Sequence, residues 1–442
     1  MRKLVVLMVA LTMLGVIIGC GGSNTNKAES SSADKATTDK VAAETPAPAS
    51  TSKPPEPASL VFMVNSVDAT FESTQEVLED YQKQNPHIKI EFISGGKDYE
   101  SLMKAKMAAN DLPDLFATHG WSVDRYSEYL LPLNDQPWAN QIEDTILPII
   151  SNEKGEIFVL PVNIDISGII YNKDILKKLE IEVPQTWDEL LAASEKIKNA
   201  GITPIAFFGK DDRTIAHALD KLATPFLISD PAHDFSAALQ DGTFDWQNWT
   251  AVSAALLTLK DKEYLNKDAL TADPINKPKM LAEEKVAFIF ENNKIVTEAK
   301  ALNPNLNLGM MPVPAVHSGD QPVLIGGERE AYGVWKGSKN QEAALQVLEF
   351  LARPENIKKI ATASSSPAGL KGVEVDLGTL TEDIQKYTSL RTFPYFDRES
   401  LPSGMWSTLR TIGPAILSKQ LTPEQTSTVM KTDYEKLRAQ QQ

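Results

Sequence analysis

The sequence contains a single cysteine, Cys20, among its 442 residues, so it can form no disulfide bond within the chain. No apolar run reaches the ~20 residues that a membrane-spanning helix requires. Positive charge is also scarce, because 44 lysines and arginines stand against 59 aspartates and glutamates, a formal net charge of −15. An acidic chain is repelled by phosphate-rich surfaces. We therefore expect neither nucleic acid nor an anionic lipid surface as a general partner.

Motifs of the common enzyme classes are missing as well. The sequence has no Walker loop, nucleophile elbow, dinucleotide-binding glycine pattern or EF-hand loop. Its five histidines are far apart, and none forms the helical pair that a zinc site often uses. We expect no catalytic residue, no cofactor and no metal. One enzymatic alternative stays open, a secreted glycoside hydrolase that uses two cleft carboxylates such as Asp124 and Asp165.

The cysteine follows a pattern that is typical of an export signal. Two basic residues precede an apolar run from Leu4 to Ile18, and small residues follow it. The stretch Ile17-Ile18-Gly19-Cys20 resembles a bacterial lipobox, in which the cysteine receives lipid and cleavage occurs just before it. We predict a signal peptide over residues 1–19 and lipidation of Cys20. The alternatives are an ordinary signal peptide that ends in cysteine, or a buried thiol.

The composition of the next segment predicts a tether. Residues 21–58 contain no aromatic residue, and Val41 is their only large aliphatic one. Such a segment cannot bury enough apolar surface to offset the entropy of ordering it. We predict that residues 20–58 form a lipidated, disordered linker spanning roughly 35 Å. This linker would hold a folded body at the extracellular face of the membrane of a Gram-positive cell.

The body, residues 59–442, alternates short strand-like runs with helical ones. Residues 60–64 form a continuous apolar run that is typical of a buried strand, a helical pattern follows, and residues 87–92 alternate like a second strand. This rhythm predicts an α/β fold with doubly wound, mostly parallel sheets whose carboxyl edges carry the ligand site. The body has more residues than a single hydrophobic core usually accommodates, so we expect two lobes.

Residues 161–178, PVNIDISGIIYNKDILKK, resemble the signature of family 1 bacterial extracellular solute-binding proteins, the group that contains maltose-binding protein. The likeness extends over residues 59–442. It implies a two-lobed periplasmic-binding-protein-like fold of type II, with a ligand cleft between the lobes. The expected boundaries are about 59–163 and 293–326 for lobe 1, and about 167–290 and 330–442 for lobe 2.

The resemblance also implies a function. It identifies the chain as the substrate-binding protein of an ABC importer, which captures a mono- or oligosaccharide by lobe closure and delivers it to membrane permease subunits. We expect a monomer. An adhesin or a sensor subunit with the same fold stays open as an alternative. Arg213 and Arg329 leave room for an acidic sugar, and a peptide or polyol ligand is not excluded.

Two segments carry the principal site candidates. Asn163 and Asp165 are polar residues in an otherwise apolar run, and the resemblance places Asp165 where maltose-binding protein has an acidic ligand contact. Both residues could instead cap backbone at the hinge. The segment ATHGWSVDRY contributes His119, Trp121, Asp124 and Arg125 after a predicted strand. Trp121 offers a flat face to a pyranose or a cover for the core, and the Asp-Arg pair resembles one with pocket roles in maltose-binding protein.

Weaker candidates follow other predicted strands or resemble the last lobe crossing. Trp406 would supply an aromatic platform, since the tryptophan that this family often carries after the strand at 286–290 is absent here. The remaining members of this group are Asn65, Ser66, Asp211, Arg213, Glu291, Asn292, Glu328 and Arg329. A solvent-exposed surface position is the alternative for each charged member.

Overall fold

The computed structural model describes residues 56–387 and 389–441. The predicted signal peptide, Cys20 and nearly all of the predicted linker lie outside this range. Within it, no helix combines the length and the apolar character needed to cross a membrane. The described residues form helices and strands around two large clusters of buried apolar side chains.

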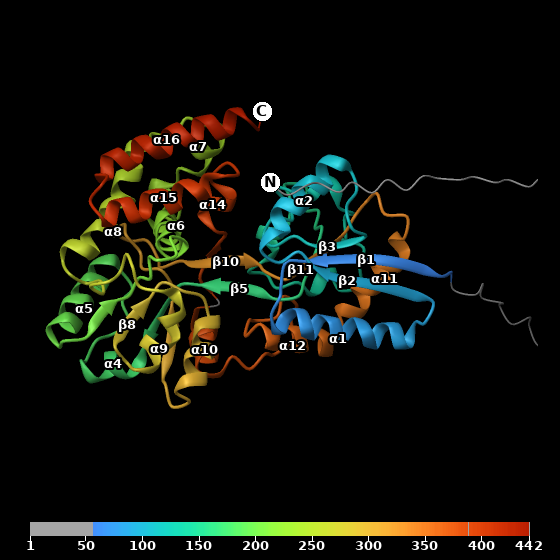
Figure 1. Ribbon diagram of the computed structural model, residues 1–442, viewed down its shortest axis with the longest axis horizontal. Helices are drawn as coiled ribbons and strands as arrows, with labels where there is room; N and C mark the ends of the chain where they lie inside the picture. Colours follow the sequence, from blue (N-terminus) through green and yellow to red (C-terminus); the bar gives the residue numbers. More distant parts are fainter. Residues whose placement is uncertain (1–55, 388, 442) are drawn as a thin grey trace, which may run out of the picture. The chain divides into compact units, whose positions relative to one another are not determined.

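The first lobe is built on a five-stranded sheet (Figure 1). Its strand order is β2 (Ile88–Ser94), β1 (Ala58–Val64), β3 (Leu115–Ala117), β11 (Ala331–Val334) and β4 (Leu160–Pro161). β1 is parallel to β2 and β3, whereas β11 runs antiparallel to β3 and β4. The helices of this lobe are α1 (Ala69–Gln84), α2 (Tyr99–Ala109), α3 (Leu147–Ile150), α11 (Gln341–Leu351) and α12 (Pro354–Ala363), with α11 and α12 packed on α1.

The second lobe is built on a four-stranded sheet. Its order is β7 (Thr203–Ile205), β8 (Val286–Ile289), β6 (Ile169–Asn172) and β9 (Leu308–Met311). β7 is parallel to β8, and β6 is antiparallel to both of its neighbours. The helices are α4 (Lys173–Lys178), α5 (Trp187–Asn199), α6 (Arg213–Leu227), α7 (Ser236–Asp241), α8 (Trp249–Asp261), α9 (Lys277–Ala282), α10 (Lys294–Leu302), α13 (Thr381–Tyr387), α14 (Phe396–Glu399), α15 (Met405–Leu417) and α16 (Pro423–Ala439).

A third, three-stranded sheet lies where the chain passes between the lobes. β5 (Ile164–Ser167) pairs antiparallel with β10 (Leu324–Glu328), so that Asp165 stands opposite Gly327, and β12 (Thr392–Phe393) pairs with β10 in parallel. Figure 1 shows β5 and β10 side by side. The chain therefore crosses three times, along β5, along β10 and in the segment that leads from α12 to β12.

The strand pairing corrects the predicted lobe boundaries. Residues 293–326 were expected in lobe 1, but β9 pairs with β6 in the second sheet. Residues 330–442 were expected in lobe 2, but β11 lies in the first sheet and α12 packs on α1. The prediction that each sheet is mostly parallel is confirmed in strand direction, because β11 alone runs against the other strands of the first sheet and β6 alone against those of the second. The α/β class itself is confirmed.

Local sequence explains how several elements begin and end. Helix α5 begins with a capping box, in which Thr186 Oγ1 accepts from the amide of Glu189 while the Glu189 carboxylate accepts from the amide of Thr186. The extended segment after Asn163 is interrupted at Gly168, where a Cβ atom would stand 2.3 Å from the carbonyl oxygen of Met311. β5 and β6 are therefore separate strands that belong to different sheets.

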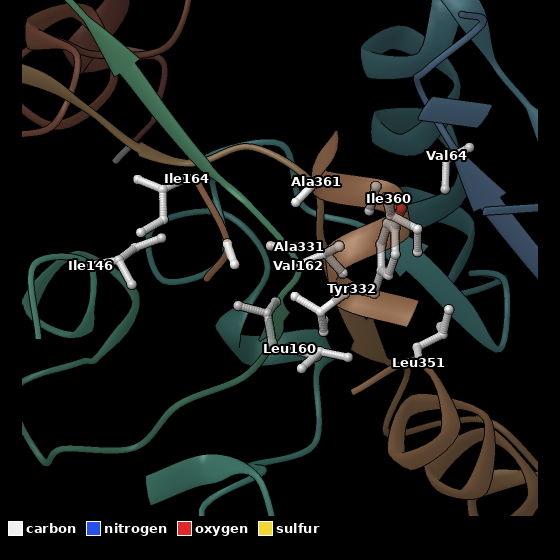
Figure 2. Packing of buried hydrophobic residues seen from close by; sticks show 14 of the residues in the cluster. Val64, Ile146, Leu160, Val162, Ile164, Ala331, Tyr332, Leu351, Ile360 and Ala361 are labelled. Atoms are coloured by element: carbon white, nitrogen blue, oxygen red, sulfur yellow. The ribbon is translucent and has the colours of Figure 1, made fainter. Parts of the chain in front are cut away.

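The core of the first lobe joins residues that are distant in the sequence. Leu160 and Val162, just before the first crossing, are fully buried in the same cluster as Ala331 and Tyr332, which follow the second crossing (Figure 2). Each fully buried aliphatic side chain contributes about 1.5–3 kcal/mol of transfer free energy. This packing fixes the lobe-1 ends of β5 and β10, and the candidate site residues lie along the strands beyond these ends.

Three tryptophans differ in burial. Trp138 is buried, whereas Trp187 and Trp335 are only partly buried and pack against the two clusters.

Candidate functional site

The side chains of strand β5 point alternately to its two faces, and each face borders a different space. Ile164 and Ile166 line a pocket of about 760 Å³ on one face. Because successive side chains of a strand point to opposite faces, Asp165 faces the other way, where its carboxylate is almost fully buried. This second face is the candidate ligand site.

Asp165 connects all three crossings. Its Oδ2 accepts a hydrogen bond of 2.7 Å from the Tyr395 hydroxyl, and its Oδ1 lies 3.5 Å from Arg329 Nη1 without forming a hydrogen bond. Burial alone lowers the pKa of Arg329, but the charges of Asp165 and Glu330 outweigh it and raise that pKa above its ordinary value. Asp165 thus holds a structural position and keeps one buried oxygen available for a further donor.

Asn163, two residues earlier, is fully occupied by the protein. It is completely buried, its Nδ2 donates to Ser364 Oγ at 2.7 Å, and its Oδ1 accepts from the amide of Glu330 at 2.9 Å. These contacts correspond to the hinge-capping alternative. Asn163 ties the first crossing to the second and offers no free polar atom to a ligand.

Glu328 organises the loop over residues 118–122, which contains the predicted residues His119 and Trp121. Its Oε1 accepts hydrogen bonds from Thr118 Oγ1 at 2.6 Å, from the amide of Gly120 at 2.8 Å and from the amide of Ser122 at 3.1 Å. Its Oε2 is buried without a hydrogen-bond partner. Since three donors converge on one carboxylate oxygen, Glu328 positions the loop and presents only its second oxygen to the site.

The loop presents Trp121 within a cluster of charged groups. The guanidinium of Arg125 lies 4.0 Å from the Trp121 ring centre and forms an ion pair with Glu100, whose second oxygen lies 3.4 Å from His119. The Arg398 guanidinium of the second lobe lies 5.8 Å from the same ring. Asp124, from the same segment, is exposed. The indole face is therefore shared with arginine in this conformation of the loop.

Helix α6 contributes a row of basic residues from the opposite lobe. Arg213, His217 and Lys221 follow one another at intervals of four residues, which places them on one face of the helix. The His217 ring lies 4.7 Å from the ring of Trp406. Burial, reinforced by the charge of Lys221, holds the pKa of His217 well below its ordinary value, so the ring is neutral at physiological pH.

One pocket of about 360 Å³ draws its lining from both lobes. It brings together the predicted residues His119, Trp121, Arg125, Arg213 and Trp406. It also contains Glu100, His217, Tyr395, Asp397, Arg398, Ser403 and Gly404, which were not predicted. The two lobes come close together at Gly120 and Arg398, because a Cβ atom added to Gly120 would collide with the guanidinium of Arg398.

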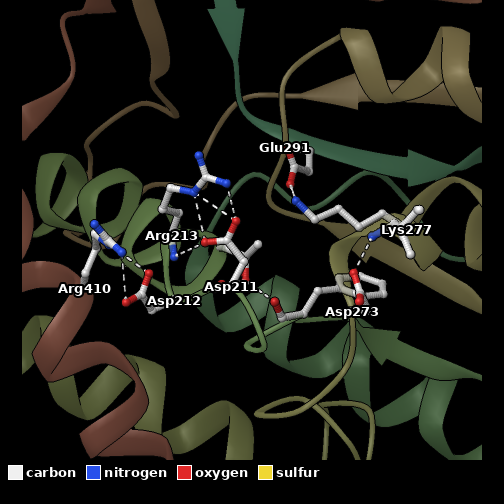
Figure 3. Close-up of polar contacts among 10 residues, drawn as sticks. Asp211, Asp212, Arg213, Asp273, Lys277, Glu291 and Arg410 are labelled. Carbon is white, nitrogen blue, oxygen red and sulfur yellow. Dashed lines mark hydrogen bonds and ion pairs between the residues drawn. The ribbon is translucent and has the colours of Figure 1, made fainter. Parts of the chain in front are cut away.

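Two other predicted acids are paired with nearby cations (Figure 3). Asp211 accepts from the Arg213 side chain at 2.9 Å and from its backbone amide at 3.1 Å, and the arginine itself is exposed. Glu291 forms an ion pair with Lys277 of α9. These pairs neutralise most of the charge that this side of the site would otherwise present.

The remaining predictions lie at strand ends. Asn65 and Ser66 follow β1, and the Asn65 Oδ1 and Ser66 Oγ atoms are buried without a partner. Asn292 follows β8 and accepts from the amide of Lys294 at 3.2 Å. Nearby, Lys294 Nζ forms an ion pair of 3.1 Å with Asp68, which links α10 to the first lobe. Asn65 and Ser66 therefore retain unused polar atoms, whereas the Asn292 side-chain oxygen is already hydrogen-bonded to Lys294, the first residue of α10.

Helix α6 carries a buried lysine and a buried aspartate, Lys221 and Asp220, that were not predicted from the sequence. Lys221 is 3% exposed and makes no hydrogen bond within the described residues, although Glu291, Asp220 and Asp165 are close enough to act on its charge. The neighbouring Asp220 is fully buried and accepts from the amide of Asp397 at 2.8 Å. The i, i+4 spacing from Arg213 was the available signal for Lys221.

Comparison with known proteins decides the family. Residues 65–358 match the model of the bacterial extracellular solute-binding protein family. The chain belongs to this family. The melibiose/raffinose/stachyose-binding protein MelE of Bacillus subtilis is 36% identical over 383 residues, which cover 86% of this chain and 90% of MelE. The predicted family is thereby confirmed.

Solved structures of solute-binding proteins confirm the two-lobed fold. A binding protein of Bacillus subtilis in an open conformation matches with a TM-score of 0.85 and 35% identity over 87% of this chain and 98% of that one. A sugar transporter protein of Bacillus licheniformis, in complex with stachyose, matches with a TM-score of 0.76 and 39% identity over 86% of this chain and all of that one.

Proposed function

We propose that this solute-binding protein captures a neutral oligosaccharide, of the class formed by melibiose, raffinose and stachyose, for an ABC importer. The support from similarity is that a relative named for these three sugars and a structure containing stachyose are 36% and 39% identical to this chain. Both similarities extend over more than four fifths of the chain. The pocket lined by both lobes is where such a ligand would favour closure, because contacts to both lobes exist only in the closed state.

The observation that favours a neutral ligand is that most cationic side chains around the site are paired with acids. Arg125, Arg213, Lys277 and Arg329 are each matched with an acid, namely Glu100, Asp211, Glu291 and Asp165. Lys221 and Arg398 make no ion pair in the described part of the chain, but Asp220 lies close to both. An anionic ligand would have to displace these acids, so an acidic sugar is the poorer match.

Four polar atoms on residues outside the lining of the 360 Å³ pocket would be available to sugar hydroxyls. Asp165 Oδ1, Glu328 Oε2, Asn65 Oδ1 and Ser66 Oγ are buried polar atoms without a hydrogen-bond partner. Buried polar groups of this kind cost about 1–3 kcal/mol each when left unpaired, so a ligand that satisfies them gains affinity. Trp406 beside neutral His217 supplies an apolar face for the C–H side of a pyranose.

The anchor completes the proposal. Lipidated Cys20 would hold the body, as a monomer, at the outer face of the membrane of a Gram-positive cell, and the segment before the body would serve as its tether. Two acyl chains give stable anchoring where a single chain is marginal. Cys20→Ala should move the protein from the membrane fraction to the medium. Retention of the variant in the membrane to the same degree as the wild type would contradict lipidation.

Calorimetric titration tests the ligand class directly. We expect saturable binding of melibiose, raffinose or stachyose, and binding of galacturonate oligomers that is at least tenfold weaker. Preference for the uronates, or binding of none of the neutral galactosides, would overturn the proposal. Hydrolysis of any of these sugars that is abolished by Asp124→Asn or Asp165→Asn would instead support the glycosidase alternative.

A further inference from the structure

A cluster of three potential metal ligands lies on the second lobe, among residues that take no part in the pocket described above. Asp230, His233 and His317 each present one ligand atom, a carboxylate oxygen or a ring nitrogen, and these atoms all lie within 4.8 Å of one another. The two imidazoles are stacked, with ring centres 3.8 Å apart and planes inclined by only 6°. His233 is exposed and the other two residues are partly buried, so the cluster is open to an ion from solvent.

Each histidine already has a partner for one of its ring nitrogens. His233 Nδ1 lies 2.5 Å from Asp230 Oδ2, and His317 Nε2 lies 3.2 Å from the carbonyl oxygen of Phe226. A carbonyl oxygen only accepts, so His317 Nε2 carries the proton and its Nδ1 has a free lone pair. A metal-binding histidine commonly donates its second nitrogen to a backbone carbonyl, as His317 Nε2 does to Phe226, and this fixes the ring and its tautomer.

The charges around the cluster favour a cation. Phe226 lies in the last turn of α6, where the helix dipole concentrates negative charge. Asp230 adds a carboxylate whose Oδ2 lies 2.5 Å from His233 Nδ1.

The surrounding loops are held in place by their own hydrogen bonds. Asp230 Oδ1 accepts from the amide of Ala232 at 3.2 Å, and Ser229 Oγ donates to Asp320 Oδ2 at 2.5 Å. The amide of Asp320 in turn donates to the carbonyl of His317 at 3.2 Å. The segment before His233 and the turn after His317 are thus joined before any ion arrives, which limits the entropy that binding must overcome.

We propose that Asp230, His233 and His317 form a binding site for a divalent transition-metal ion of the Zn²⁺ type. Two imidazoles and a carboxylate are ligands that Zn²⁺ prefers, with water as the fourth. Bonds of about 2.0–2.1 Å in a tetrahedron place neighbouring ligand atoms roughly 3.3 Å apart. The His233–Asp230 contact therefore opens by less than about 1 Å when the ion enters, and one of the two stacked rings turns, because an imidazole binds an ion in its own ring plane. The bound ion would join the C-terminal end of α6 to the turn after His317.

Titration of a tag-free, chelator-stripped protein with Zn²⁺ tests the site. We expect one equivalent to bind and to raise the melting temperature, whereas Mg²⁺ and Ca²⁺, which prefer oxygen ligands, should do neither. His233→Ala and His317→Ala should each weaken Zn²⁺ binding on the order of 100-fold. His87→Ala removes a histidine before β2 and serves as the matched control that keeps full affinity.

Two outcomes would overturn the site. One is Zn²⁺ binding that His233→Ala and His317→Ala leave unchanged, and the other is the absence of a stoichiometric Zn²⁺ event in the wild type. Melting curves recorded without metal show whether a variant is folded. A variant that is destabilised there is replaced by His233→Gln or His317→Gln, which keep a polar side chain but remove the imidazole.

Discussion

The Tyr395 hydroxyl donates a 2.7 Å hydrogen bond to Asp165 Oδ2, and this bond links the third crossing of the chain to the first. The sequence left two roles open for Asp165, a ligand contact or a hinge cap. The structure gives it a definite structural partner and also leaves its Oδ1 buried without a hydrogen bond. The two roles can therefore coexist, and a pair of variants separates them.

Asp165→Asn should weaken sugar binding by about 10- to 100-fold, because a charge-assisted hydrogen bond contributes about 1.5–3 kcal/mol. It should also lower the stability of the unliganded protein, since Arg329 loses its counter-charge. Tyr395→Phe removes only the structural hydrogen bond and should cost about 1 kcal/mol of stability with a small change in affinity. Titration calorimetry and urea unfolding measure both effects. Equal losses of affinity in the two variants would show that Asp165 acts only through the hinge.

Glu328→Ala should release the loop that contains Trp121, because one carboxylate oxygen accepts three hydrogen bonds from that loop. We expect a loss of about 2–4 kcal/mol in unfolding free energy and a changed tryptophan emission spectrum. Glu328→Gln keeps an oxygen acceptor and should lose less than half as much. If the alanine variant matches the wild type in stability, the three hydrogen bonds do not hold the loop.

Asp220→Asn should change how stability depends on pH. Burial, together with the Asp397 carboxylate, raises the pKa of Asp220 well above its ordinary value. A carboxyl whose folded pKa is raised stabilises the fold below its unfolded pKa of about 3.9, and this contribution is lost as pH rises through the folded pKa. The variant has no proton to lose, so its stability relative to the wild type should increase as pH rises from 4 to 8. Urea unfolding at several pH values measures this. A difference that is constant with pH would contradict the prediction.

Lys221→Met tests the buried lysine that the sequence did not indicate. Burial lowers the pKa of Lys221, so its charge costs stability in the fold. The variant should be at least as stable as the wild type but should bind the sugar about tenfold less tightly, if the ammonium donates to ligand hydroxyls. Lys210→Met, which removes an exposed lysine paired with Asp273 at 2.5 Å, is the control and should keep full affinity. Unchanged affinity in Lys221→Met would remove it from the site.

The sequence predicted those site residues that are marked by a motif or a strand close to them in the chain. The crossing at Asp165 lies inside a motif, and the loop of Trp121 and Arg125 directly follows a strand, so both could be located from their neighbours in the chain. Tyr395 and Arg398 reach the site only because the chain crosses a third time, and no motif marks that crossing. The lobe boundaries were wrong for the same reason, since the partner of β9 is set by packing in the second sheet.

The roles of individual side chains were harder to predict than their location. Asn163 and Glu328 lie at the crossings, as expected, but their partners are the Glu330 amide and the 118–122 loop, which are distant in sequence. His233 and His317 looked isolated for the same reason, and only folding stacks their rings. Spacing along the chain reports such contacts only within one helix, as it does for Arg213 and Lys221.

The alternation of side chains along β5 has a practical consequence for monitoring lobe closure. Ile164 and Ile166 line the 760 Å³ pocket, while Asp165 faces the ligand site from the same strand. We therefore expect bending that narrows one space to widen the other. Val375 also lines that pocket, and the body of the chain contains no cysteine. A fluorophore attached to a thiol introduced at Val375 would thus report lobe closure optically from the face opposite the sugar, without competing for the ligand.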